Sequence, residues 1–111
     1  RRWRKMYRGT TPTLRFEIED ESGQSIPTSL IKTLYITFAQ DQTVVLERTD
    51  AIKDGNIASV TLTQQETLAL SSGIGKYPVT VQLRGKLLDG NIFASQKIAL
   101  EVEAILKDGE I

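Results

Sequence analysis

The sequence contains no cysteine and no histidine among its 111 residues. Without cysteine, the chain cannot form disulfides, thiolate nucleophiles or cysteine-ligated zinc sites. Without histidine, it lacks the commonest general base and the commonest ligand of transition metals. The glycine-flanked serine of a nucleophile elbow and the glycine-rich phosphate loops are missing as well. We therefore expect no enzyme, no cofactor and no bound metal.

Long apolar runs are also missing. None approaches the roughly 20 residues that span a bilayer, so we expect no membrane contact. The chain carries 14 basic and 14 acidic residues, but these are unevenly distributed. Five basic residues fall within the first eight positions, which leaves 9 basic and 14 acidic side chains in the other 103 residues. The chain therefore begins with a basic segment and continues as an acidic domain of ordinary globular composition.

Most of the chain alternates between apolar and polar residues, which is typical of strands with one buried face. In the first such segment the inner positions are Leu14, Phe16 and Ile18. In the longest segment, both sides of the turn at Asp89-Gly90 alternate, and this pattern predicts a long antiparallel hairpin. Strands are expected over residues 13–19, 34–40, 43–48, 57–62 and in both arms of 75–105.

One short helix is expected before the hairpin, because Thr63 and Glu66 have the spacing of a capping box and Gly73 ends the pattern. Six short strands, with the helix where sandwiches cross between sheets, predict an all-β, immunoglobulin-like antiparallel β-sandwich. We assign residues 1–12 to a basic N-terminal arm and residues 13–111 to a single β-sandwich domain.

Tyr77 has two interpretations. Gly75, Tyr77 and Val81 have the spacing with which immunoglobulin-like domains enter their penultimate strand, where a tyrosine hydroxyl bonds back to the crossing loop. Tyr77 is equally consistent with an aromatic core residue, and both interpretations stay open.

The basic arm is the first candidate contact surface. Gly9 and Pro12 argue against a regular element across it. A solvated tail, a contact with an acidic protein, and a nucleic-acid contact through arginine and stacked aromatic rings all remain open. Nucleic-acid binding would weaken steeply with salt, and the acidic remainder of the domain argues against a broad nucleic-acid-binding face. The residues concerned are Arg1, Arg2, Trp3, Arg4, Lys5, Tyr7 and Arg8.

The hairpin tip is the second candidate contact surface. Leu87, Leu88, Ile92 and Phe93 bracket the turn, so both faces are apolar where an exposed tip is normally polar. Either strand twist buries these side chains or they form a partner surface. Phe93→Arg separates the alternatives. If Phe93 is a core residue, the substitution would unfold the chain; if it is an interface residue, the substitution would leave a folded monomer.

A third cluster is acidic and consists of Glu17, Glu19, Asp20 and Glu21 at the end of the first expected strand. Such carboxylates can begin a calcium site or form an acid pair. A solvated strand face that runs into a turn has the same composition, and we interpret the cluster in this way.

Several segments carry a resemblance to known proteins: YRGTTPTL (7–14), SLIKTLYITF (29–38), LTQQETL (62–68), DGN (89–91), AS (94–95) and ILKDGEI (105–111). Together they are similar to small prophage-encoded proteins of low-GC Gram-positive bacteria. More loosely, the pattern resembles the N-terminal immunoglobulin-like domain of siphophage baseplate upper proteins, a domain that attaches receptor-binding parts to the tail.

The resemblance implies a non-enzymatic structural or adaptor protein of a phage or prophage tail or baseplate. It implies contacts with other tail or baseplate proteins and with further copies of the chain. It also implies a place in the virion after synthesis in the bacterial cytoplasm. The residues leave two alternatives. One is a nucleic-acid-binding protein that uses the basic arm. The other is a carbohydrate- or ligand-binding module, for which the available aromatic residues are Trp3, Tyr7, Tyr35 and Phe93.

Overall fold

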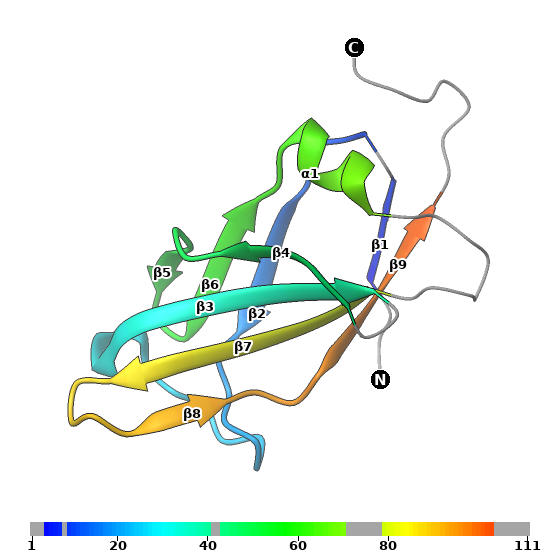
Figure 1. The fold of residues 1–111 in the computed structure, drawn as a ribbon. Coiled ribbons are helices and arrows are strands. Elements are labelled where there is room, and N and C mark those ends of the chain that lie inside the picture. The colour runs from blue at the N-terminus through cyan, green and yellow to red at the C-terminus, as the bar shows by residue number, and fades with distance from the viewer. Residues whose placement is uncertain (1–3, 8, 41–42, 71–78, 104–111) are drawn as a thin grey trace.

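Two β-sheets pack face to face in the computed structural model, which describes residues 4–7, 9–40, 43–70 and 79–103 (Figure 1). The larger sheet has the order β1-β9-β7-β3-β4, with β8 also paired to β7, and the smaller sheet has the order β2-β6-β5. The elements are β1 (Arg4–Tyr7), β2 (Thr13–Glu17), the 3-10 helix η1 (Thr28–Leu30), β3 (Ile31–Gln40), β4 (Thr43–Arg48), β5 (Ile52–Asp54), β6 (Ile57–Thr61), α1 (Gln64–Ala69), β7 (Val79–Leu87), β8 (Ile92–Ala94) and β9 (Ile98–Glu103).

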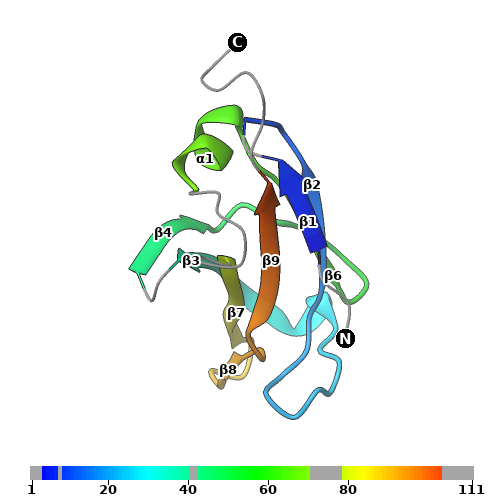
Figure 2. The ribbon, with the colours of Figure 1, turned by 90° about the vertical axis from the view of Figure 1, so that its right-hand side faces the viewer.

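The connections between the sheets have the order of an immunoglobulin-like sandwich. The chain changes sheet between β2 and β3, between β4 and β5, and between β6 and β7. Strands β2, β6 and β5 therefore correspond to B, E and D of that fold, and β3, β7 and β9 correspond to C, F and G. Helix α1 follows β6 on the last of these crossings (Figure 2). The predicted β-sandwich with one short crossing helix is confirmed.

The core lies between the sheets because alternate residues of β2, β6 and β7 point inward. Phe16 from the smaller sheet and Phe38 from the larger sheet are the largest of the fully buried side chains. Burial of one such side chain stabilises the fold by about 1.5–3 kcal/mol. The other buried apolar residues are Leu14, Ile18, Ile26, Ile31, Leu34, Ile36, Ala58, Val60, Leu62, Leu70, Val79, Val81, Leu83, Phe93, Leu100 and Val102.

Helix α1 begins with the predicted capping box. The backbone N–H of Glu66 donates to Thr63 Oγ1 over 3.1 Å, and the backbone N–H of Thr63 donates to Glu66 Oε1 over 2.8 Å. A helix of six residues is unstable alone. It is held by the buried side chains of Thr67 and Leu70, and the Thr67 hydroxyl donates to the Thr10 carbonyl over 2.8 Å. Tyr77 lies outside the described residues, and its two interpretations stay open.

Two strands were not predicted from the sequence. Residues 4–7 form β1, which pairs in parallel with β9 from Arg4↔Leu100 to Tyr7↔Glu103, so the expectation of no regular element across residues 1–12 is wrong. Strand β5 pairs only with β6, and its three residues are exposed. Both are short strands at sheet edges, where pairing needs backbone groups and no alternation of buried side chains.

The return arm of the predicted hairpin is two strands rather than one. Gly85 pairs with Phe93 on β8, whereas Val79 pairs with Leu100 on β9, so the register shifts by one residue between them. Ser95 satisfies the backbone groups of Leu83 at the break between β8 and β9. Its N–H donates to the Leu83 carbonyl, and its hydroxyl accepts from the Leu83 N–H over 3.0 Å. The extra residue moves the buried positions from odd to even numbers along the chain.

Candidate functional site

The two predicted contact surfaces lie at different places on the six-stranded sheet. Of the basic arm, Arg4, Lys5 and Tyr7 belong to β1 at one edge, and Tyr7 is 55% exposed. Arg1, Arg2, Trp3 and Arg8 lie outside the described residues. The arm is therefore attached to the sandwich over residues 4–7, and its partner remains a prediction.

The structure divides the hairpin tip into a buried half and an exposed half. Phe93 belongs to the hydrophobic core at 8% exposure, and Leu87 is partly buried against that core. Leu88 and Ile92 are 65% and 61% exposed. Of the four predicted tip residues, only Leu88 and Ile92 are thus available to a partner.

Gly85 explains why Phe93 turns inward. The two residues face each other across β7 and β8, and a Cβ at Gly85 would lie 2.6 Å from Phe93 Cε1 and 2.8 Å from the Thr33 carbonyl oxygen. The absent side chain at Gly85 is therefore the space that the Phe93 ring occupies. This cross-strand pair fixes which face of β8 points into the core.

A third exposed apolar residue, Leu30, joins the surface half of the tip. It ends η1 and is 49% exposed, and its carbonyl accepts a hydrogen bond from the Leu88 N–H over 2.9 Å. The turn between β7 and β8 is closed by Asp89 Oδ1, which accepts from the Asn91 N–H, and by Gly90 at a φ of 93°. We call Leu30, Leu88 and Ile92 the tip patch. The sequence did not indicate Leu30, because it lies 58 positions before Leu88.

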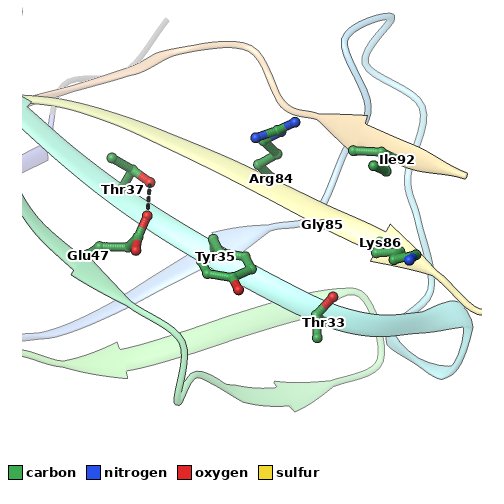
Figure 3. Close-up of a pocket in the computed structure, with 8 residues that line it drawn as sticks. All are labelled: Thr33, Tyr35, Thr37, Glu47, Arg84, Gly85, Lys86 and Ile92. Carbon is green, nitrogen blue, oxygen red and sulfur yellow. Dashed lines mark hydrogen bonds between the residues drawn. The ribbon is translucent and has the colours of Figure 1, made fainter. Parts of the chain in front are cut away.

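The outer face of the six-stranded sheet carries a second feature, a hollow of about 390 Å³ (Figure 3). We call it the outer-face hollow. It runs along β3 and β7 between β4 and β8, and Figure 3 shows Tyr35 between Thr33 and the Thr37–Glu47 pair, with Arg84 and Lys86 on the neighbouring strand. Its lining residues are Thr33, Tyr35, Thr37, Glu47, Arg84, Gly85, Lys86 and Ile92.

The ion pairs found among the described residues involve no residue of the tip patch and no lining residue of the hollow, and they centre on Arg48. Its Nε and Nη2 donate to the two carboxylate oxygens of Asp50, each over 2.8 Å. Its Nη1 donates to Glu66 Oε1 over 2.7 Å and to the Thr61 carbonyl over 3.0 Å. The guanidinium thus joins β4 of the larger sheet to the end of β6 and to α1, which indicates a structural role.

The hydrogen bonds from Arg48 hold the pKa of Asp50 below its ordinary value of 3.8. A depressed native-state pKa stabilises the fold above the ordinary value, and this contribution is lost as the pH falls through the native-state pKa. We expect Asp50→Asn to be less stable than the native chain at pH 6. The gap should close as the pH falls below the ordinary pKa of 3.8, measured by urea unfolding at each pH. A gap that stays constant as the pH falls would contradict the assignment.

The acidic cluster behaves as a turn. Asp20 Oδ1 accepts hydrogen bonds from the Ser22 hydroxyl over 2.6 Å, from the Ser22 N–H over 2.9 Å and from the Gln24 N–H over 3.0 Å. The Ser22 hydroxyl and then the Gln24 N–H lower the pKa of Asp20. Across the described ranges, no three carboxylates are placed to hold a metal ion. The interpretation as a solvated strand end and turn is consistent with this geometry.

Comparison with known proteins does not identify a family, because no family model, curated protein or solved structure matches this chain. Within the ranges that the structure describes, no helix is long and apolar enough to cross a membrane. The fold and the two surface features are therefore the basis for a functional assignment.

Proposed function

We propose that this chain is a structural or adaptor protein of a phage or prophage tail or baseplate, and that it acts through protein–protein contacts without catalysis. The observation that carries the proposal is the tip patch, in which Leu30, Leu88 and Ile92 are each 49% exposed or more. The backbone hydrogen bond from Leu88 to Leu30 and the turn between β7 and β8 bring the three residues together. Exposed apolar side chains that lie together mark interaction surfaces.

The composition around the tip patch supports a protein partner. Protein–protein interfaces combine an apolar centre with a polar rim. Here Lys86 and Asp89, both exposed, stand on either side of Leu88 in the sequence of the hairpin. Lys86 also lies directly opposite Ile92 across β7 and β8. A partner that covers the tip patch therefore meets charged groups at its margin.

The particle assignment is supported by the similarity of the six sequence segments to prophage-encoded proteins. Tail and baseplate parts are repeated around an axis, so the partners we propose are other tail or baseplate proteins and further copies of this chain. The virion is the corresponding location, after synthesis in the bacterial cytoplasm.

Leu88→Asp is expected to keep the chain folded and to exclude it from particles. The side chain is 65% exposed, so the free energy of unfolding should change by no more than about 0.5 kcal/mol. A carboxylate would, however, have to lose its water in a covered apolar patch. Particles induced from the bacterium that encodes the chain are purified and blotted for the native chain and for each variant.

Ile52→Asp is the matched control, because Ile52 is 74% exposed on β5 of the other sheet. The native chain and this control should be found in particles in equal amounts. Absence of the native chain from purified particles would contradict the particle assignment. Incorporation of Leu88→Asp at the native level would contradict the tip patch as the contact.

A further inference from the structure

We propose that the outer-face hollow binds an acidic saccharide, meaning a sugar unit that carries a carboxylate or a phosphate. Ile92 and Lys86 also belong to the tip patch and its margin, but other residues of the hollow support the proposal as well. It depends on three properties of the hollow: two cations that have no partner among the described residues, a carboxylate at one margin, and an exposed tyrosine.

The positive charge comes from Arg84 and Lys86, which stand two residues apart on the same face of β7. Their cross-strand neighbours are all uncharged. Arg84 lies opposite Tyr35 and Ala94, and Lys86 lies opposite Thr33 and Ile92. No ion pair or hydrogen bond is recorded for either cation within the described part of the chain. Two adjacent, unpaired cations above neutral side chains form a site for one negatively charged group.

The opposite end of the hollow has a different chemistry. There Glu47 on β4 lies opposite Thr37, whose hydroxyl donates to Glu47 Oε2 over 3.4 Å (Figure 3). Lys86 lies opposite Thr33, four residues from Thr37 on β3, and Arg84 lies opposite Tyr35, two residues from Thr37. Along the strand, about 13 Å therefore separates the level of Lys86 from that of Glu47, and about 7 Å separates the level of Arg84 from it. Glu47 repels a second negative charge but accepts hydrogen bonds from hydroxyl groups. The hollow therefore favours a ligand that is acidic at one end and hydroxylated at the other.

Tyr35 lies between Thr33 and Thr37 on β3, directly opposite Arg84, and is 44% exposed. Its ring offers an apolar surface, and its hydroxyl makes no recorded hydrogen bond within the described residues. Ile92 adds a second apolar wall on the β8 side. Together they can pack against the C–H groups of a sugar ring while the hydroxyls of the ring reach Thr33, Thr37 and Glu47. An acidic peptide would also meet the cations, but its further carboxylates would face Glu47.

The test is a titration of the full, isotope-labelled chain, in which NMR spectra record the amide chemical shifts at each ligand concentration. The probes are glucuronic acid, glucose 6-phosphate, glucose, inorganic phosphate and a hexaglutamate peptide. We expect one or both acidic sugars to cause saturable shifts at residues 33–37 and 84–86, with an affinity at least tenfold above that of glucose or phosphate. Comparison of the two acidic sugars shows whether a carboxylate or a phosphate is preferred.

Two pairs of variants make the result specific. Arg84→Gln should weaken binding of the acidic sugars at least about tenfold, because a hydrogen bond to a charged group is lost. Arg15→Gln, at an exposed arginine of the other sheet, should leave binding unchanged. Tyr35→Ala should weaken binding and Tyr7→Ala should not.

Four outcomes would overturn the proposal: equal binding of glucose, equal binding of inorganic phosphate, tighter binding of hexaglutamate, or shifts outside the hollow. Tighter binding of hexaglutamate would indicate an acidic protein segment as the occupant. None of these outcomes affects the particle experiment, in which Leu88 is the variable residue.

Discussion

Phe93→Ala is expected to lower the free energy of unfolding by about 3–5 kcal/mol. The Phe93 ring is buried in the core and fills the space that Gly85 leaves on the neighbouring strand. Alanine would remove the apolar burial and leave a cavity beside Gly85 that neither strand can close. Denaturant unfolding followed by far-UV circular dichroism measures the change.

Ile92→Ala is the matched control for Phe93→Ala. The two residues are neighbours on β8, but Ile92 points outward and is 61% exposed. Its substitution should change the free energy of unfolding by no more than about 0.5 kcal/mol. Equal losses for the two variants would mean that the hairpin does not have the orientation described, with Phe93 inward and Ile92 outward.

Arg48→Met should also have a large effect, a loss of about 2 kcal/mol from hydrogen bonds to charged groups and from the contact with a backbone carbonyl. The guanidinium donates to Asp50, to Glu66 and to the Thr61 carbonyl, and its side chain is only 18% exposed. Methionine keeps most of the apolar stem and removes every donor, so Glu66 loses its ion-pair partner. Urea unfolding at neutral pH measures the loss.

Arg15→Met is the control for Arg48→Met, because Arg15 is exposed on β2 and has no recorded partner within the described residues. We expect its stability to remain within about 0.5 kcal/mol of the native value. If both variants lost the same stability, the effect would come from the change in net charge. The assigned link between β4, β6 and α1 would then be wrong.

Local patterns in the sequence predicted most of the fold. The alternation of Leu14 and Phe16 identified β2, and the spacing of Thr63 and Glu66 identified the start of α1. Each of these signals is complete within one element, so no knowledge of its neighbours is needed. The order of the elements was then enough to predict an immunoglobulin-like sandwich.

Features that depend on a neighbouring strand could not be predicted in the same way. Strand β1 forms through backbone pairing with the edge of β9, and its four residues carry no alternating pattern of their own. The break at Ser95 is evident from the burial in the structure, because Phe93 is inward at an odd position and Leu100 is inward at an even one. That change of parity requires one extra residue between β8 and β9.

The candidate site was predicted only in part. An excess of apolar residues at the tip was correctly located at 87–93, but its division into core and surface depends on Gly85, which lies across the strand pair. The outer-face hollow was not predicted at all. Its residues come from β3, β4, β7 and β8, and only the register of these strands brings Tyr35 opposite Arg84.

Photo-crosslinking from position 88 tests the central proposal most directly. Leu88 is replaced by the photoreactive residue benzoylphenylalanine, assembled particles are irradiated, and the crosslinked partner is identified by mass spectrometry. We predict a crosslink to a tail or baseplate protein or to a second copy of the chain, and none from the same residue placed at Ile52. Crosslinks from position 52 with none from position 88 would contradict the tip patch as the contact surface.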